Sequence, residues 1–329
     1  MKKDTDIPKF SVAIITYNQE KFIGRALDSV LIQKEWVYEI VICDDCSKDN
    51  NWNIIMDYYH KYPEIIRPFR NEKNLGIYGN IERTWQECTG DLIIDLSGDD
   101  TLYNGVFEEA YKTISKYNID YKNKAVSIFC DFDIKYPNGF RRKAPRNNLL
   151  LNKNLDPVSL KLRRLVFNRT SFYSNKLLKK YIPVPKDLGH FCDELVDIQR
   201  VLFSDEIYYF KFIGSTYYAH IGVSVNHTAD EYLKSMDLTS EILKNTLKLG
   251  KKDILYLDYQ HHKRILLYGK HSWKQFFTTI KYYFKSRELK YGIRGLDLSR
   301  ISIDTFKLLI KIFKQFLTIS NMNNFCLKN

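Results

Sequence analysis

Long apolar runs are missing from this sequence, and their absence excludes some classes of protein. No stretch approaches the roughly 20 uninterrupted apolar residues of a membrane-spanning helix. The opening Met-Lys-Lys-Asp-Thr-Asp leads straight into an apolar segment typical of a strand, without the apolar region of a signal peptide. We therefore expect a cytoplasmic protein that is neither secreted by that route nor integral to a membrane.

Paired cysteines and glycine-rich phosphate loops are missing as well. The six cysteines show no paired metal spacing beyond Cys43-Asp-Asp-Cys46, so we interpret them as reduced core residues. Neither a Gly-x-Gly-x-x-Gly run nor a Gly-x-x-x-x-Gly-Lys loop occurs. This argues against a dinucleotide oxidoreductase and against a phosphate-loop nucleotide hydrolase.

Apolar residues and positive charge are plentiful. The 329 residues are 44% hydrophobic, enough for one large domain with an appendage or for two domains. Of the net charge of +12, +11 lies between Lys251 and Asn329, where 16 Lys and Arg face 5 Asp and Glu. A nucleic acid or an anionic lipid surface could be the partner of such a region.

Short apolar runs alternate with segments of helical spacing. The runs at 11–15, 38–43, 65–69 and 92–96 predict strands, and Pro68 predicts that the third is an edge strand. Apolar residues at steps of three and four predict helices after these strands and at 106–117. Gln19 and Glu20 stand near the start of the first helix, where a carboxylate complements the helix dipole. The alternation predicts an α/β fold with a parallel, right-handed sheet.

The strand at 92–96 ends in an acidic turn, Ser97-Gly98-Asp99-Asp100. Ligands bind at the carboxyl ends of strands in open α/β sheets, and adjacent hard oxygen ligands there suit Mg²⁺ or Mn²⁺ on a diphosphate. Polar loops also follow the first two strands, at 16–18 and 44–49. We predict that the three loops meet at one edge of the sheet as a nucleotide site. The alternative is an ordinary Ser-Gly-Asp-Asp turn.

These segments resemble family 2 glycosyltransferases of the GT-A fold, in order and spacing, over about residues 9 to 105. The resemblance implies a Rossmann-like, mostly parallel sheet flanked by helices, with a nucleoside-diphosphate sugar as donor. It is carried by Ser-Val-Ala-Ile-Ile-Thr-Tyr-Asn at 11–18, the helix end from Ser29 to Gln33, Glu-Ile-Val-Ile-Cys-Asp-Asp-Cys-Ser-Lys-Asp at 39–49, Asn-Leu-Gly at 74–76, and Gly-Asp-Leu-Ile-Ile-Asp-Leu-Ser-Gly-Asp-Asp at 90–100.

The resemblance also implies roles for individual residues. Ile15 stands where the family commonly has proline, and Ser97 replaces the first acid of the usual Asp-x-Asp. Binding of Mg²⁺ or Mn²⁺ would therefore rest on Asp99 with Asp100. The residues implied in holding the nucleotide sugar, directly or as support, are Thr16, Tyr17, Asn18, Glu20, Asp44, Asp45, Ser47, Asn74, Gly76, Ser97, Gly98 and Asp99.

The segment from Gly189 to Arg200 resembles the Glu-Asp motif that starts a helix in this family and supplies the catalytic base. The two acids stand in reversed order here. The resemblance implies Glu194 as the base that deprotonates the acceptor, with Asp193 as its rival. The alternative is that both acids only stabilise a helix start. His220 resembles a histidine that would touch the diphosphate or metal, although a lone histidine is more often structural.

Beyond residue 105 the resemblance weakens. Ala125 to Ile134 predicts a strand, and Pro137-Asn138-Gly139 predicts a tight hairpin turn. The basic clusters Arg141-Arg142-Lys143 and Arg163-Arg164 could meet an anionic acceptor or donor, or could be solvated surface charge. We leave both clusters unassigned.

We divide the chain into a GT-A catalytic domain at 1–229 and a helical, basic, aromatic C-terminal region at 230–329. Within the first, 9–105 would bind the nucleotide and 106–229 the acceptor. In the second, Phe306, Leu309, Ile310, Phe313, Phe316 and Leu317 predict a basic amphipathic helix. Its apolar face could lie on an anionic membrane, pack on the catalytic domain, or pair with a second subunit in a homodimer.

The sequence thus predicts an inverting glycosyltransferase that acts on an acceptor hydroxyl of a lipid-linked or cell-surface polysaccharide precursor. A nucleic acid is not expected as a partner. We expect it in the cytoplasm, with peripheral contact to the inner face of the plasma membrane through the C-terminal region. The alternatives are a transferase for a soluble or protein acceptor and a nucleotide-binding module without catalysis.

Overall fold

Two compact units make up the chain. The computed structural model describes residues 7–143, 170–219, 221, 228–247, 249–268, 277–278 and 280–282. Contacts group the chain into Met1–Asn226 and His227–Asn329. This division lies close to the predicted boundary at residue 229, while the assignment of a role to each domain stays a prediction.

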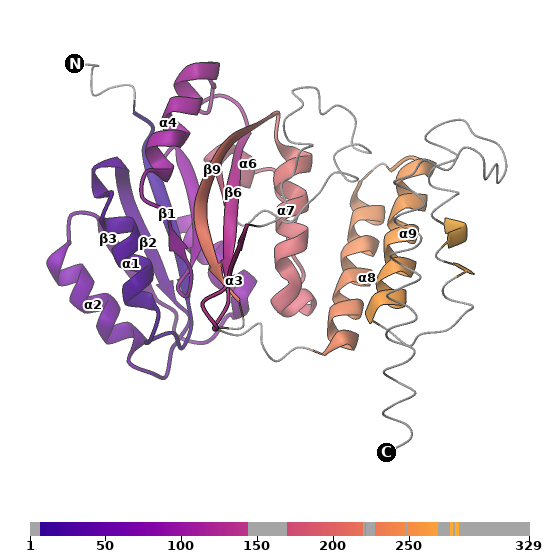
Figure 1. Cartoon of the computed structure of the whole chain (residues 1–329), viewed down its shortest axis with the longest axis horizontal. Coiled ribbons are helices and arrows are strands. Elements are labelled where there is room, and N and C mark those ends of the chain that lie inside the picture. Colours follow the sequence, from indigo (N-terminus) through magenta and orange to yellow (C-terminus); the bar gives the residue numbers. More distant parts are fainter. Residues whose placement is uncertain are drawn as a thin grey trace. The chain divides into compact units, whose positions relative to one another are not determined.

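In the described part of the first unit, nine strands form one sheet in the order β3-β2-β1-β4-β8-β6-β9-β5, and β7 pairs with β6 (Figure 1). The strands are β1 (Phe10–Thr16), β2 (Val37–Asp44), β3 (Ile66–Arg70), β4 (Leu92–Ser97), β5 (Thr101–Leu102), β6 (Val126–Lys135), β7 (Arg141–Lys143), β8 (Ser171–Ser174) and β9 (Glu206–Tyr218).

The first half of the sheet is parallel, as predicted. β1 lies between β2 and β4, and β3, which contains Pro68, is the edge strand on that side. Beyond β4 the sheet is mixed, because β8 pairs antiparallel with both β4 and β6. β8 was not predicted from the sequence. β6 and β9 then run parallel. The predicted α/β class with its helix-flanked sheet is confirmed.

The helices predicted for the first unit are present at their expected places. Helix α1 buries residues at steps of three and four, as Ile23, Ala26, Leu27 and Val30 show. The elements of the first unit are α1 (Ile23–Leu31), η1 (Lys34–Trp36), α2 (Asn51–Lys61), α3 (Gly76–Glu87), α4 (Val106–Tyr117), α6 (Asn175–Leu178), η2 (Lys186–Phe191) and α7 (Cys192–Phe203), where η marks a 3-10 helix.

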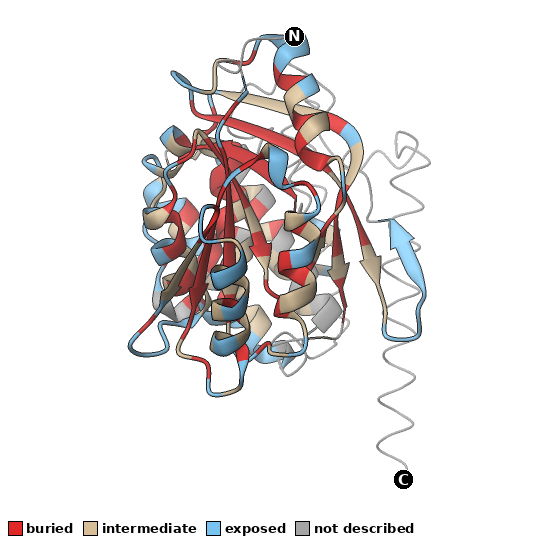
Figure 2. Ribbon diagram, turned by 90° about the vertical axis from the view of Figure 1, so that its left-hand side faces the viewer, coloured by how far each residue is buried: buried red, intermediate tan, exposed pale blue. Residues whose placement is uncertain are grey.

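The core follows the central strands, whose residues are mostly buried (Figure 2). Rings of Phe10, Phe107 and Phe172 meet there with centroids 5.3 to 5.7 Å apart and join β1, α4 and β8. Each such pair adds about 0.5–1.5 kcal/mol beyond area burial. The described cysteines are free, and burial raises the pKa of Cys43 to about 11. They match the predicted reduced core thiols except Cys46, which is partly exposed.

The second unit contains α8 (Ala229–Thr246) and α9 (Lys251–Tyr268), joined by an ion pair of 2.8 Å between Lys244 and Asp258. Thr228 and Glu231 form a reciprocal capping box at the start of α8. No helix among the described residues is long and apolar enough to cross a membrane. The predicted amphipathic helix at 306–317 lies outside the described residues, and so does the Arg163-Arg164 cluster.

The amino ends of β1, β2 and β4 meet around one buried carboxylate, Glu39. Its oxygens accept hydrogen bonds from the Ser11 hydroxyl at 2.6 Å, the Thr89 N–H at 2.5 Å and the Arg67 guanidinium at 2.5 Å. Burial pushes the pKa of Glu39 up, but these hydrogen bonds together hold it below its ordinary value of 4.5. The charged form of Glu39 therefore stabilises the folded state.

A lowered folded pKa gives stability that is present above the unfolded pKa and lost as pH falls through the folded value. We expect the free energy of unfolding to fall as pH drops below 4.5. Because Glu39→Gln removes this titration, the variant should be less stable at neutral pH and lose less on acidification. Urea unfolding across that pH range measures both. If the free energy of unfolding fell equally with pH in the two proteins, Glu39 would not be the group responsible.

Candidate active site

Three loops meet where β1, β2 and β4 end. The Asp45 N–H donates to the Thr16 carbonyl at 2.9 Å, and the Gly98 N–H donates to the Ile15 carbonyl at 2.9 Å. A Cβ atom on Gly98 would lie 2.5 Å from Gln19 Oε1, so only glycine fits at this position without displacing a neighbour. The predicted convergence of the three loops is thus seen in the structure.

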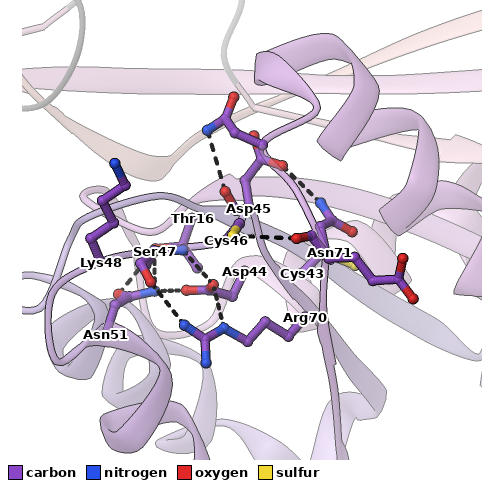
Figure 3. A network of polar contacts seen from close by, with 12 residues as sticks. Thr16, Cys43, Asp44, Asp45, Cys46, Ser47, Lys48, Asn51, Arg70 and Asn71 are labelled. Atoms are coloured by element: carbon purple, nitrogen blue, oxygen red, sulfur yellow. Dashed lines mark hydrogen bonds and ion pairs between the residues drawn. The ribbon is translucent and has the colours of Figure 1, made fainter.

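Asp44 holds the second loop from inside (Figure 3). Its side chain is fully buried and accepts hydrogen bonds from the Ser47 N–H at 2.8 Å and from Asn51 Nδ2 at 2.7 Å. Arg70 Nε lies 3.5 Å from the same carboxylate. Ser47 Oγ in turn accepts the Asn18 N–H at 2.9 Å, which ties the first loop to the second. Asp44 and Ser47 therefore support the loops.

Asp45 organises the turn that leads into α3. Its Oδ1 accepts the Leu75 N–H and Asn71 Nδ2, each at 2.8 Å, and its Oδ2 accepts the Gly76 N–H at 3.0 Å. Gly76 has φ +77, a conformation that favours glycine. Asn74 adds a hydrogen bond of 3.3 Å to the Asp45 carbonyl. Asp45 is almost fully buried among protein donors, and its predicted contact with a nucleotide stays a prediction.

Glu20 caps a different helix from the one expected. Its Oε2 accepts the N–H of Asn50, the residue before α2, at 2.8 Å, while the Glu20 N–H donates to Asp49 at 2.9 Å. No acidic residue lies in the first turn of α1. The sequence assigned Glu20 to α1 because it is near in the chain, whereas the folded loops bring it to α2.

The remaining predicted residues of the first loop differ in exposure. Thr16 is buried and donates its hydroxyl hydrogen bond to Gln19 Oε1 at 2.8 Å. Tyr17 is partly exposed, and Asn18 is exposed with a positive φ of 51°. Asn18 Oδ1 accepts the Lys48 N–H at 2.8 Å. Of these three, Tyr17 and Asn18 present side chains at the surface of the site.

The acidic turn is held by neighbours on both sides. Asp100 is buried, and its Oδ1 accepts the Tyr218 N–H at 3.0 Å from the end of β9. Arg25 on α1 donates to the Asp99 carbonyl at 2.6 Å. Ser97 and Asp99 are partly exposed. Asp100 thus supports the turn, and the Asp99 side chain lies nearer to solvent.

The turn fits a substrate-assisted metal site better than a closed protein cage. No cluster of three or more His, Cys, Asp or Glu side chains that could hold a metal occurs among the described residues. Mg²⁺ in nucleotide sites commonly takes one or two carboxylates and completes its shell with phosphates and water. The partly exposed Asp99, with Asp100 behind it, supplies that kind of donor set.

An ion pair that was not predicted from the sequence joins α7 to β4. Arg200 pairs with Asp95, and its Nη1 also donates to Asp197 at 2.9 Å. Asp95 Oδ1 accepts the Tyr173 hydroxyl at 2.5 Å and Trp85 Nε1 at 2.8 Å. Burial alone would lower the pKa of Arg200, but the Asp95 carboxylate raises it, so this buried guanidinium stays charged. In the sequence, the sign of this pair was Asp95, a single acidic residue inside an apolar strand.

The direction of α7 follows from its carboxyl end. Ile93 on β4 pairs with Tyr173 on β8, which pairs with Ser127 near the start of β6. Ser127 Oγ lies 2.8 Å from Ser204 Oγ, just past the end of α7. The helix therefore ends near the beginning of β4 and starts toward the acidic turn.

The distance along α7 from Arg200 to its first residue is similar to the distance along β4 from Asp95 to the acidic turn. Cys192, the first residue of α7, precedes Arg200 by about 12 Å of helix. Asp99 follows Asp95 by at most roughly 13 Å of extended chain. The 3-10 helix η2, which leads directly into α7, packs against α3, and α3 begins at Gly76 in the turn that Asp45 holds. The start of α7 thus reaches the end of the sheet that holds the three loops.

Of the residues predicted beyond the three loops, Asp193 is described by the structure. Asp193 lies on the same face of α7 as Asp197 and Arg200, because positions i, i+4 and i+7 align on a helix. The side chain of Glu194 lies outside the described residues, as does His220.

Comparison with known proteins decides the family. The model of the family described as "Glycosyl transferase family 2" matches residues 11–181, slightly more than half of the chain. The chain belongs to this family. The resemblance identified from the motifs is therefore confirmed.

Several curated relatives carry names, and two of them are EpsE and TarS. The putative glycosyltransferase EpsE of Bacillus subtilis is 26% identical over 129 residues, 39% of this chain and 46% of EpsE. The poly(ribitol-phosphate) β-N-acetylglucosaminyltransferase TarS of Staphylococcus aureus is 25% identical over 264 residues, 76% of this chain and 43% of TarS. The chain thus spans less than half the length of the relatives it matches.

Solved structures share the fold. Residues 1–349 of S. aureus TarS in complex with UDP-GlcNAc match with a TM-score of 0.59 and 20% identity, over 85% of this chain and 81% of the other. A mannosyltransferase from Pyrobaculum calidifontis, in complex with GDP-Man and Mn²⁺, matches with a TM-score of 0.53 and 12% identity, over 97% and 85% of the two chains. These likenesses confirm the GT-A fold.

The ion pair between Asp95 and Arg200 gives a stability prediction. Asp95→Asn should lower the free energy of unfolding by about 2–3 kcal/mol, because it leaves a buried guanidinium short of its nearest carboxylate. The value lies below that of a fully buried pair because the Asp95 side chain is 30% exposed. Urea unfolding measures the loss.

The matched control is Glu108→Gln. Its ion pair with Lys112 is exposed on both sides, so its loss should lower the free energy of unfolding far less than the loss of the Asp95 pair. Equal losses in the two variants would show that the Asp95 pair contributes no more than a surface pair.

Proposed function

We propose that the protein is an inverting glycosyltransferase that moves a sugar from a nucleoside-diphosphate sugar to a hydroxyl of a lipid-linked or cell-surface polysaccharide precursor. One observation carries the proposal: β4 bears the acidic turn at its end and holds, through Asp95, the helix α7, whose first turn contains Asp193 and Glu194. The printed name of TarS, a poly(ribitol-phosphate) transferase, supports a cell-surface acceptor.

Each group would have one task in a single in-line displacement. The loops around Thr16, Asp45 and Gly76 would hold the nucleotide, and the turn at Asp99 would face the diphosphate. Glu194, or its rival Asp193, would take the proton of the acceptor hydroxyl as that oxygen attacks the anomeric carbon opposite the nucleotide. Inversion of configuration follows from one displacement.

A divalent cation, Mg²⁺ or Mn²⁺, would be held by Asp99 with support from Asp100. When bound, it would neutralise charge on the diphosphate leaving group. Because Ser97 supplies no charge, the protein's share of the binding energy would be small and the phosphates of the donor would supply the rest.

A nucleotide-binding module without catalysis is the second candidate, and the serine at position 97 is the observation that favours it. A panel of nucleotide sugars with Mn²⁺ and a polyol phosphate acceptor separates the two. Release of nucleoside diphosphate that depends on acceptor supports the transferase. Nucleotide binding without any turnover would favour the module.

The location of the protein also stays a proposal. The absence of a spanning helix among the described residues is compatible with the expected cytoplasmic location. Peripheral contact with anionic lipid would rest on the basic C-terminal region, where each Lys or Arg near the surface contributes about 1 kcal/mol. Homodimerisation through the same region is the competing use of its apolar face.

Asp99→Asn tests the acidic turn. We expect turnover to fall on the order of a hundredfold, because the change removes the carboxylate assigned to the cation. The fold should be preserved, since Asp99 is partly exposed. Ser97→Asp is the matched control and should be tolerated, because it restores the acid that the family commonly has. Near-normal, metal-dependent turnover in Asp99→Asn would contradict the assignment.

The base is tested by a pair of isosteric variants. Glu194→Gln should lower sugar transfer by about a hundredfold to ten-thousandfold while donor binding is kept, because an amide cannot accept the proton. Asp193→Asn should cost less. Transfer rates and nucleotide affinity are measured on both proteins, and the opposite order of effects would assign the base to Asp193.

A further inference from the structure

The basic cluster at 141–143, unassigned from the sequence, forms the exposed strand β7. A tight turn at Gly139, with φ +83, leads from β6 into β7, as the sequence predicted. Every residue of β7 is exposed, and Figure 2 shows it as a strand coloured exposed along its whole length. β7 therefore presents positive charge at the side of the sheet, where it pairs with β6 alone among the described strands.

The two faces of β7 carry different residues. Lys135 pairs with Arg141, and Asp133 pairs with Lys143, so these four side chains share one face of the sheet. Arg142 points to the opposite face because side chains alternate along a strand. We call Lys135, Arg141 and Lys143 the cationic row. Asp133 lies among them and forms an ion pair of 3.2 Å with Arg141, so this face carries three cations and one anion.

Strand register connects this row to the acidic turn. Lys135 on β6 pairs with Tyr218 on β9, and the Tyr218 N–H donates to Asp100 at 3.0 Å. From Asp100 the path to Arg141 thus crosses β9 and β6, three steps of about 4.8 Å or roughly 14 Å in all. Arg141 also donates to the hydroxyl of Tyr103 at 2.7 Å, just beyond the acidic turn in the chain.

Positive charge continues from the turn to the row. The Tyr218 ring has Arg25 at 3.5 Å from its centroid and Lys135 at 5.4 Å. Arg25 is the residue that donates to the Asp99 carbonyl. Cations on one side of the site therefore run outward from the acidic turn to the edge of the sheet.

We propose that the cationic row binds phosphate groups of the acceptor chain, at a repeat beyond the one that receives the sugar. This rests on the proposed function, since it names the acceptor class of that same site as a phosphate-bearing polymer. The distance to the turn exceeds one polyol phosphate repeat, so the row contacts a part of the acceptor that does not react. Phosphates along such a chain carry the charge opposite to that of the lysines and the arginine in the row.

A simpler role for β7 is protection of a sheet edge, because charged residues on edge strands prevent pairing with other chains. Protection of the edge requires charged side chains on β7, but these side chains can lie on either face of the sheet. Binding of an acceptor needs the cations on the face that leads to the turn. Arg142, on the same strand and opposite face, is therefore the matched control for Lys143.

The test compares Lys143→Glu with Arg142→Glu, using poly(ribitol phosphate) and single ribitol 5-phosphate as acceptors. We expect Lys143→Glu to raise KM for the polymer about fivefold, with kcat, donor KM and the KM for the single unit unchanged. The dependence of log KM on log salt should become shallower by about one for each phosphate that the row no longer neutralises. Arg142→Glu should leave all of these values near those of the unchanged protein.

Binding of the polymer, measured without donor, separates this proposal from the function it rests on. Loss of polymer affinity in Lys143→Glu alone supports the row even if no donor is turned over. Equal effects of the two variants, equal effects on polymer and single unit, or an unchanged salt dependence would overturn it. Equal binding of an uncharged polysaccharide would overturn the phosphate assignment.

Discussion

The ion pair between Asp95 and Arg200 sets the arrangement on which the site depends. Asp95 lies two residues before the end of β4 and accepts hydrogen bonds from Tyr173 and Trp85 as well. A buried guanidinium needs such partners, because an unpaired one costs several kcal/mol. The pair therefore fixes the rotation and the height of α7 against the sheet. Because α7 runs from the acidic turn toward the beginning of β4, its length brings its first turn to the end of β4.

β4 thus serves two parts of the chemistry at once. Its end forms the acidic turn, braced by Arg25 from α1 and by Tyr218 from β9, while its interior holds the helix of the proposed base. Donor and acceptor groups must be held within a few tenths of an ångström for displacement to be fast. A shared strand provides this because both parts refer to one rigid element. The loops after β1 and β2 complete the site through hydrogen bonds between their backbones.

Local patterns in the sequence were sufficient for the strands and helices of the first half and for the convergence of its loops, since parallel strands end at one edge. Local patterns could not predict which segments far apart in the chain pair with each other. β8 is four residues long and comes late in the chain, yet it lies beside β4. The pairing of Asp95 with Arg200 depends on that arrangement, and so does the contact of Glu20 with α2. Motif resemblance supplied roles for Asp99 and Glu194, but burial of Asp45 and Asp100 among protein donors could be seen only in the fold.

The most direct measurement is a crystal structure of the protein with a nucleoside-diphosphate sugar and Mn²⁺. The account predicts that the diphosphate lies against the turn at Asp99, that the nucleotide occupies the loops after β1 and β2, and that the start of α7 faces the anomeric carbon. A nucleotide bound elsewhere, or an anomeric carbon out of reach of both Asp193 and Glu194, would contradict it.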